Sequence, residues 1–463
     1  MSSVAVEVLS ERIEEYIEEN KLDEAVRLFK RQTPPNKLDI LVRLDHNSRY
    51  KLLSRIPLED LVEILAKLPE EIAFEVLVVK GIDRLVDTLI EMPSDQVADF
   101  LLKIPPRYRV KILSLMITPK RIEVESLLRY PPESVGGVMT PQIPIFYKEK
   151  TVGKAIEEYT IKDSLGLYDK HRYIYVVDKG RKFIGWLDVK TFLTRPRDKK
   201  LGEVVQKPPA VIEVHRDREE AARIAIKYDL LEIPVVDKEY RLLGAVTIDD
   251  VLDVVISEYG EDLLKFGGFM DAVRESYIIA KPTRLAIKRI PAIIYLYLMN
   301  SITGSIVAGF ANVIERVAIL AAFLPMLSDN SGNIGSQASS IILRSLVMGE
   351  IASTKRDAAR VLMKEFLVTT IMLLFLLPVG ASIAFGITYA SSMDVSYATR
   401  VSLVIVIALA VSCYVADMVG TLLPLVLAHF HVDPAVMSAP LITTIADIAT
   451  ASTYFIVAIT LLG

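Results

Sequence analysis

A single carboxylate in the middle of a long apolar stretch is the first feature of this sequence that points to chemistry. Residues 435–462 contain Asp447 but no lysine or arginine that could pair with it. A carboxylate in the hydrocarbon of a bilayer is costly, so such a residue normally faces a water-filled path or a buried partner. We therefore interpret Asp447 as a group that faces a water-filled path.

A second group of polar residues interrupts the apolar stretch at 317–347. It reads S-D-N-S-G-N-I-G-S-Q from 328 to 337 and includes Asn330, Gly332 and Asn333. Glycines can release backbone carbonyls from a helix, and carbonyl and amide oxygens are ligands that hard cations prefer. Close helix packing through small residues is the alternative. A further acid, Asp417, fits either a pore role or a packing role.

Membrane-spanning helices are the elements that must position these residues. About 20 helical residues cross the hydrocarbon of a bilayer. Five stretches are long and apolar enough, at about 290–314, 317–347, 366–390, 401–430 and 435–462. Basic residues precede the first stretch and cluster around the second connection. The positive-inside rule then predicts an α-helical domain of five spans in the cell membrane, with a cytoplasmic N-terminus and the C-terminus outside.

The first 130 residues are rich in charge and resemble a series of short helices. The chain has 54 Lys/Arg and 58 Asp/Glu, and only 11 and 9 of these lie from residue 281 onward, so most of the charge lies in the first 280 residues. A proline or glycine recurs every 12 residues, at Pro57, Pro69, Gly81, Pro93 and Pro105. Proline fits the first turn of a helix and disrupts later turns. The spacing predicts an all-α helical repeat domain over 1–130.

A duplicated α/β module follows the helical repeat. Residues 173–178 and 183–188 match 232–237 and 242–247 at a constant offset of 59. With I-P-V-V-D at 233–237 and G-A-V-T-I-D-D at 244–250, this pattern resembles a tandem CBS pair, which we place at 131–200 and 201–257. CBS pairs commonly bind adenosine nucleotides. The resemblance implies a site for ATP or another adenosine nucleotide at Gly244, Thr247 and Asp250.

Two motifs in the membrane stretches resemble a known family. P-M-L-S-D-N-S-G-N-I-G-S-Q at 325–337 and D-P-A-V-M-S-A-P-L-I-T-T-I-A-D at 433–447 are similar to signatures of the MgtE magnesium transporters. The resemblance implies a homodimeric, Mg²⁺-selective channel that holds its ion at Asp447. It also implies that Asp433 lines the cytoplasmic mouth, and that Asn330, Gly332 and Asn333 supply oxygen ligands nearby.

The chemistry of Mg²⁺ is compatible with one acid per subunit. Mg²⁺ keeps several of its waters and is usually bound through one or two carboxylates. In a two-fold dimer, both Asp447 side chains could approach the symmetry axis. Five spans per chain are also few for a closed pore, which favours a dimer.

An acidic run joins the second CBS copy to the membrane stretches. Its members are Asp249, Asp250, Asp253, Glu258, Glu261 and Asp262. Acid runs are usually solvated helix faces, but this run continues into a segment that we interpret as a connecting (plug) helix over 258–289. We predict that these acids and those of the N-terminal domain repel one another without Mg²⁺. Bound Mg²⁺ would neutralise them and close the pore domain at 290–463.

Several other functional classes can be weighed from the sequence. No phosphate-binding loop or hydrolase motif occurs, so we do not expect an enzyme. No basic patch dominates, so we do not expect nucleic acid as a partner. Two alternatives to the channel stay open. One is a secondary transporter that couples a divalent cation to H⁺ or Na⁺, and the other is a membrane-anchored adenylate sensor.

Overall fold

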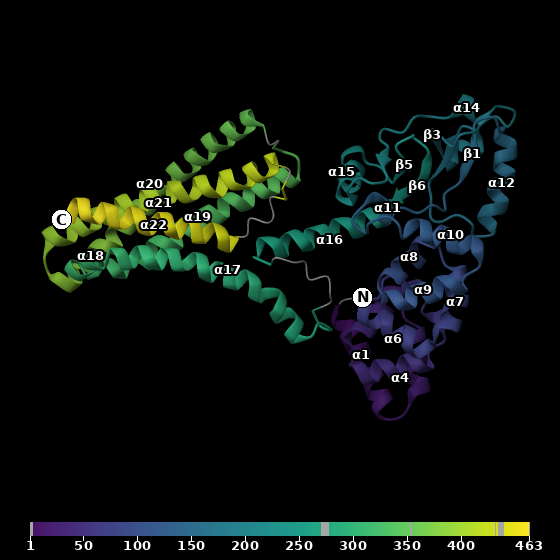
Figure 1. Cartoon of the computed structure of the whole chain (residues 1–463), viewed down its shortest axis with the longest axis horizontal. Coiled ribbons are helices and arrows are strands. Elements are labelled where there is room, and N and C mark those ends of the chain that lie inside the picture. Colours follow the sequence, from purple (N-terminus) through teal and green to yellow (C-terminus); the bar gives the residue numbers. More distant parts are fainter. Residues whose placement is uncertain (1–2, 270–276, 352–353, 431, 434–438, 463) are drawn as a thin grey trace. The chain divides into compact units, whose positions relative to one another are not determined.

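The computed structural model describes residues 3–269, 277–351, 354–430, 432–433 and 439–462 (Figure 1). The chain divides into two compact units. The first contains residues 1–258 and 275–280, and the second contains 259–274 and 281–463. Each unit has its own apolar core.

Short helices at a 12-residue spacing build the N-terminal part of the first unit. Helical segments begin at residues 58, 70, 82, 94 and 106, each directly after one of the predicted Pro or Gly breaks. The predicted all-α repeat is therefore confirmed. The helices are α1 (Ser3–Glu18), α2 (Leu22–Lys30), α3 (Pro34–Arg43), α4 (His46–Arg55), a 3₁₀ turn (Leu58–Asp60), α5 (Val62–Leu65), α6 (Glu70–Lys80), α7 (Ile82–Glu91), α8 (Ser94–Leu102), α9 (Pro106–Leu115) and α10 (Thr118–Leu127).

Lysine side chains tie successive helices of this repeat together. Lys80 donates hydrogen bonds to the carbonyls of Leu53 and Ile56 at the end of α4. Lys120 donates in the same way to the carbonyl of Met92 at the end of α7. The last carbonyls of a helix have no partner within that helix, and a cation there also favours the helix dipole. The repeat therefore satisfies its many helix ends internally.

Two three-stranded sheets of identical topology follow, in the order β1–β2–β3 and β4–β5–β6. Each has one parallel and one antiparallel pair. The antiparallel pairing starts with Tyr173 opposite Asp188 in the first sheet and with Glu232 opposite Thr247 in the second, again at the offset of 59. The duplication is therefore confirmed. The strands are β1 (Ile145–Tyr147), β2 (Tyr173–Val177), β3 (Phe183–Asp188), β4 (Ile212–Glu213), β5 (Glu232–Val236) and β6 (Leu242–Thr247).

The two CBS copies exchange their leading segments. The backbone N–H of Gly136 donates to the carbonyl of Val214 in the second copy (2.9 Å). The N–H of Gly202 donates to the carbonyl of Lys148 in the first copy (3.0 Å). Each module is thus completed by the chain that precedes the other module. The helices here are α11 (Val135–Val138), α12 (Val152–Ser164), α13 (Val189–Thr194), α14 (Leu201–Val204), α15 (Arg218–Tyr228) and α16 (Ile248–Phe266).

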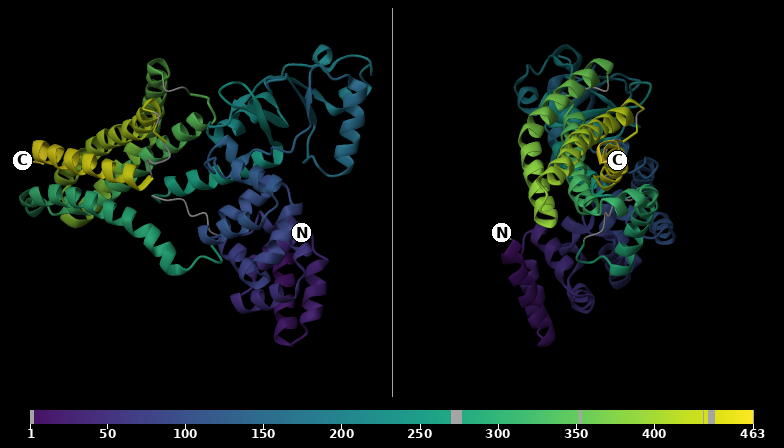
Figure 2. Two further views of the ribbon diagram at one scale, coloured as in Figure 1. Left: turned by 45° about the vertical axis from the view of Figure 1, so that its right-hand side comes forward. Right: turned by 90° about the vertical axis from the view of Figure 1, so that its left-hand side faces the viewer.

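The second unit consists of long helices, of which α19, α21 and α22 pack against one another (Figure 2). Within the described part of the chain, four helices are long and apolar enough to cross a membrane, namely α17, α20, α21 and α22. α19 carries the polar run at 328–337 and is not among them, so the count of five spans stays a prediction. The helices are α17 (Pro282–Gly309), α18 (Ala311–Arg316), α19 (Ile319–Val347), α20 (Lys355–Ser392), α21 (Val395–His429) and α22 (Ala439–Leu462).

The connecting segment differs from the single helix expected over 258–289. α16 begins inside the second CBS copy and ends at Phe266. Gly268 follows with φ +90°, a conformation that side chains disfavour, so the helix stops there. The next helix begins at Pro282, and proline suits a first turn. Residues 270–276 lie outside the described part of the chain.

Candidate functional site

Asp447 lies on α22, and its side chain faces α19. The carboxylate is partly buried and lies close to the hydroxyl of Ser328 and the carboxylate of Asp329. α22 contains no basic residue, and α19 contains only Arg344, near its C-terminal end. Asp447 and the nearby Asp329 therefore have no lysine or arginine of their own helices beside them. A hydrated divalent cation accepts this kind of donor set.

A polar stripe runs along α19 beside this acid pair. Asp329, Asn333 and Gln337 are spaced four residues apart and are exposed in the single chain, so they share one face of the helix. Asn330 is partly buried, and its side-chain amide donates to the carbonyl of Met326 (2.7 Å). Polar groups on a membrane helix normally face water or protein rather than lipid. The stripe therefore favours a water-filled path or a subunit contact.

Gly332, a predicted ion ligand, packs against a neighbouring helix. A Cβ at Gly332 would lie 3.0 Å from Cγ2 of Thr443 on α22. A Cβ at Gly335 would lie 2.8 Å from the carbonyl oxygen of Ala416 on α21. α19 is continuous from Ile319 to Val347, so its glycines do not interrupt the helical hydrogen bonds. The expectation of a freed carbonyl at Gly332 is therefore wrong, and packing is the role that its contacts support.

Asp433 forms an ion pair with α16. Its carboxylate lies 2.6 Å from Nζ of Lys265, and Glu261 lies 2.9 Å from the same nitrogen. Burial alone would lower the pKa of Lys265, but hydrogen bonds to the two carboxylates raise it above the ordinary value. Asp433, which we predicted at the mouth of the pore, and Glu261, which we predicted as a regulatory acid, thus bind the same lysine. Residues 434–438, which continue the motif, lie outside the described part of the chain.

Asp250, at the start of α16, lies near two acids of the N-terminal repeat, Asp95 and Asp99 on α8. We call these three residues the carboxyl cluster. Partial burial raises the pKa of Asp250 to about 7, and repulsion from Asp249, Asp95 and Asp99 adds to this effect. Partial burial also raises the pKa of Asp95 to about 7, and one of its oxygens is buried without a hydrogen-bond partner. Near neutral pH the cluster therefore holds protons that a cation could replace.

Basic residues partly neutralise the carboxyl cluster and its edge, because attraction to Lys103 and Lys67 opposes the rise in the pKa of Asp99. Nζ of Lys67 lies 3.2 Å from Asp253, and Nζ of Lys170 lies 3.8 Å from Asp249. All four side chains are largely exposed, and such pairs stabilise a fold by little. Across the described residues, no three His, Cys, Asp or Glu side chains converge closely enough to hold a metal ion. The structure therefore shows a repulsive cluster and not an assembled metal site.

The remaining predicted regulatory acids lie farther along α16. Glu258 lies 2.8 Å from Arg218, which also lies 2.8 Å from Glu133. Asp262 is partly buried, one residue after Glu261. The predicted set of six acids is therefore divided. Its first members lie in or beside the carboxyl cluster, and two of the later ones pair with basic residues.

A cavity of about 570 Å³ lies between the two CBS copies. The residues that line it include Lys170, Arg172, Asp188, Lys190, Thr247 and Asp249. The basic side chains can bind phosphate, and the carboxylates can accept hydrogen bonds from hydroxyl groups. The chemistry of the cavity therefore suits a small phosphorylated ligand.

Only one of the three predicted nucleotide residues lines this cavity. Thr247 does so, and its Oγ1 lies 2.5 Å from Asp249 and 2.8 Å from Asp250. Asp249 lines the cavity, whereas Asp250 belongs to the carboxyl cluster. Gly244 supports the fold, because a Cβ there would lie 2.4 Å from the carbonyl oxygen of Thr140 in the exchanged segment.

Comparison with known proteins identifies the family. Residues 324–457 match the MgtE family of divalent cation transporters, 38–133 match the MgtE intracellular N domain, and 201–257 match the CBS domain. The chain is 32% identical over 359 residues to the magnesium transporter MgtE of Thermus thermophilus, which covers 76% of this chain and 75% of that protein. The chain belongs to the MgtE family of magnesium transporters. The family model describes divalent cation transporters.

Other magnesium transporters are similar over most or about half of the chain. The magnesium transporter MgtE of Bacillus subtilis is 31% identical over 343 residues, which covers 74% of this chain and 73% of that protein. A solved cytosolic domain of the Mg²⁺ channel MgtE in complex with ATP is 30% identical, with a TM-score of 0.48, and covers 53% of this chain and 99% of that one. The solved soluble part of a magnesium transporter is 25% identical, with a TM-score of 0.46, and the match covers 55% of this chain and 99% of that one.

Sequence reasoning missed the acids that α8 contributes to this MgtE-family chain. Asp95 and Asp99 follow the break at Pro93 and lie one helical turn apart. Acids are common in the first turn of a helix because they favour the helix dipole, so the position of Asp95 looks ordinary. What distinguishes Asp95 and Asp99 is their proximity to α16, which is separated from them by about 150 residues of sequence.

Proposed function

We propose that this chain forms a homodimeric, Mg²⁺-selective channel in the cell membrane, closed by cytosolic Mg²⁺. The observation that carries the proposal is Asp447 on α22, whose side chain faces Ser328 on α19 beside the exposed polar stripe. A second copy would bring the same acids to a shared axis. Mg²⁺ could then pass with several of its waters in place, held by carboxylates and amide oxygens.

The proposed pore domain at 290–463 has five spans. α19 has 29 residues, whereas about 20 are enough to cross the hydrocarbon. Its polar stripe is acceptable in a membrane if it faces a water-filled path and not lipid. The distribution of basic residues supports a cytoplasmic helical domain (1–130) and cytoplasmic CBS copies (131–200 and 201–257), with the C-terminus outside.

The carboxyl cluster is the proposed regulatory site. Mg²⁺ that replaces the shared protons would remove the repulsion between α8 and α16. α16 also carries Lys265, which pairs with Asp433 ahead of α22. One helix thus bears both the ion sensor and a contact to the pore helices. Mg²⁺ can bias the pore only if its affinity for the closed state exceeds that for the open state.

An adenosine nucleotide is the proposed occupant of the cavity between the CBS copies. Lys170, Arg172 and Lys190 would bind its phosphates. Asp188 and Asp249 would accept hydrogen bonds from its ribose. The nucleotide would then lie next to Asp250, which follows Asp249 directly, so its binding and that of Mg²⁺ would influence each other.

Mg²⁺ uptake into proteoliposomes tests the channel. Asp447→Asn keeps the size of the side chain but removes a ligand charge, so uptake should fall by about tenfold or more. Glu315→Gln is the matched control, because Glu315 is an exposed acid of the same unit. Normal uptake by a folded Asp447→Asn protein would refute the proposed pore. Patch recordings at low and high internal Mg²⁺ distinguish a gated channel from a coupled carrier.

A further inference from the structure

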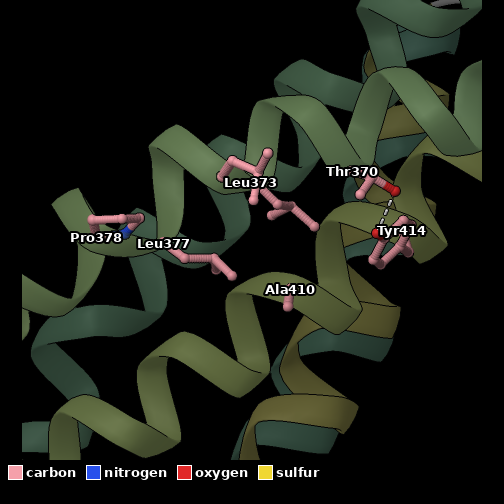
Figure 3. A pocket seen from close by; sticks show the side chains of 7 residues that line it. Thr370, Leu373, Leu377, Pro378, Ala410 and Tyr414 are labelled. Carbon is pink, nitrogen blue, oxygen red and sulfur yellow. Dashed lines mark hydrogen bonds between the residues drawn. The ribbon is translucent and has the colours of Figure 1, made fainter.

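A cavity of about 370 Å³ lies between α20 and α21 in the second unit (Figure 3). Its volume falls in the range of ligand pockets, near the lower end. Residues of both helices line it, namely Thr370, Leu373, Leu374, Leu377 and Pro378 of α20 and Ala410 and Tyr414 of α21. Leu374 is 69% exposed, so the cavity opens at the surface of the helix pair.

The two hydroxyl groups that line the cavity are already satisfied. The hydroxyl of Thr370 donates to the carbonyl of Phe366 (2.7 Å). The same hydroxyl lies 2.7 Å from that of Tyr414, which must then be the donor of the second hydrogen bond. A water molecule in a cavity needs two or more polar partners, and leucine side chains supply none. The cavity therefore suits hydrocarbon better than water or an ion.

The cavity lies at the depth of the acyl chains of one leaflet if α20 crosses a membrane. The apolar stretch of α20 starts at about residue 366. At 1.5 Å per residue, Thr370 lies about 6 Å and Pro378 about 18 Å beyond that start. The hydrocarbon of one leaflet is about 15 Å thick, half of that of the bilayer. The cavity is therefore within reach of the acyl chain of a phospholipid.

Basic residues precede the cavity on the same helix. Residues 355–365 contain four basic residues and two acids. Arg360 and Lys364 are exposed and lie one helical turn apart, and Asp357 lies 3.8 Å from Arg360. Positions 360, 363, 367, 370, 374 and 377 alternate in steps of three and four, so Arg360 shares the face of α20 that lines the cavity. The two basic residues lie about 3 to 9 Å before the apolar stretch, at the depth of lipid headgroups.

We propose that this basic pair and the cavity form one site for an anionic phospholipid. The phosphate binds Arg360 and Lys364, and one acyl chain enters the cavity between α20 and α21. Arginine and lysine are the usual phosphate ligands, and basic residues beside membrane helices attract anionic lipids. The site rests on the proposed placement of the second unit in a membrane, but not on Mg²⁺ transport.

Photolabelling of the full-length protein in phosphatidylcholine nanodiscs tests the site. Trace phosphatidylglycerol or phosphatidylcholine is added, each with a photoactivatable group in the middle of one acyl chain, and labelled peptides are mapped by mass spectrometry. Phosphatidylglycerol should label the cavity residues of α20 and α21 about fivefold or more above phosphatidylcholine, and high salt should reduce this preference. Equal labelling by the two lipids, or no labelling at the cavity, would overturn the proposal.

Variants separate the two halves of the site. Arg360→Gln/Lys364→Gln should lower phosphatidylglycerol labelling to the phosphatidylcholine level, whereas Arg400→Gln, which removes an exposed cation of α21, should not. Ala410→Leu fills the cavity and should reduce labelling by both lipids, whereas Ala390→Leu, at an exposed site on α20, is its control. An unchanged preference in the basic-pair variant rejects the headgroup site. Incorporation into nanodiscs tests the membrane placement separately, and no step depends on Mg²⁺ flux.

Discussion

The carboxyl cluster predicts that the first unit is less stable at neutral pH than at acid pH when Mg²⁺ is absent. Partial burial raises the pKa of Asp250 from 3.8 to about 7. The folded state therefore holds this proton more tightly than the unfolded chain does. The stabilisation is complete below about pH 4 and is lost as the pH rises through about 7. It amounts to at most about 4 kcal/mol, at about 1.4 kcal/mol per pH unit, and solvent at the exposed side reduces it.

Asp250→Asn tests this reasoning because it removes the charge and keeps the shape. Without Mg²⁺ at about pH 8, the variant should protect the amides of α8 and α16 from hydrogen exchange about tenfold or more better than the wild type. At about pH 6 the difference should shrink, because the wild-type carboxyl is then largely protonated. Added Mg²⁺ should protect the wild type and have little effect on the variant.

Hydrogen exchange with mass spectrometry on the full-length protein in lipid nanodiscs measures these amides. Asp198→Asn is the matched control, because Asp198 is an exposed acid of the same unit. Its protection should follow the wild type at each pH and at each Mg²⁺ concentration. If Asp250→Asn lowers protection at alkaline pH, or still responds to Mg²⁺ as the wild type does, the repulsion argument fails.

Three further outcomes follow from individual contacts. A Cβ at Gly420 would lie 2.1 Å from the carbonyl oxygen of Gly335, so Gly420→Ala should destabilise the α19–α21 contact by more than about 1 kcal/mol in detergent melts. Gly386→Ala meets no atom within 4 Å and should melt as the wild type does. Asp249→Ala should weaken ATP binding in calorimetry, and unchanged heats argue against the ribose role. Lys265→Met removes the ion pair ahead of α22, so its channels should need more internal Mg²⁺ to close in patch recordings.

Local signals in the sequence predicted most of the fold. Each break at 57, 69, 81, 93 and 105 is followed directly by a helical segment, because proline and glycine act on the backbone where they stand. The strands of the CBS copies were found from an offset of 59, since duplicated strands keep the same pairing. Long apolar stretches likewise marked the membrane helices without knowledge of their packing.

The same reasoning could not predict contacts between segments that are distant in the sequence. Asp95 and Asp250 are about 150 residues apart, and nothing in the spacing of either acid indicates the other. The exchange of leading segments explains Gly244, which the motif alone assigned to a nucleotide. In each case, tertiary packing and not a local pattern decides what the side chain does.

The energies on α16 indicate which of its contacts controls the proposed channel. Asp250 and Lys265 are 15 residues apart on this helix, which is about 22 Å of rise. The pair between Lys265 and Asp433 is partly exposed, and such pairs contribute about 1 kcal/mol or less. Burial and repulsion together destabilise the ionised form of Asp250 by at most about 4 kcal/mol. Mg²⁺ bound at the carboxyl cluster can therefore change the free energy of the channel by more than the ion pair does. The ion pair would set the Mg²⁺ concentration at which the channel closes, and Mg²⁺ at Asp250 would favour the closed state.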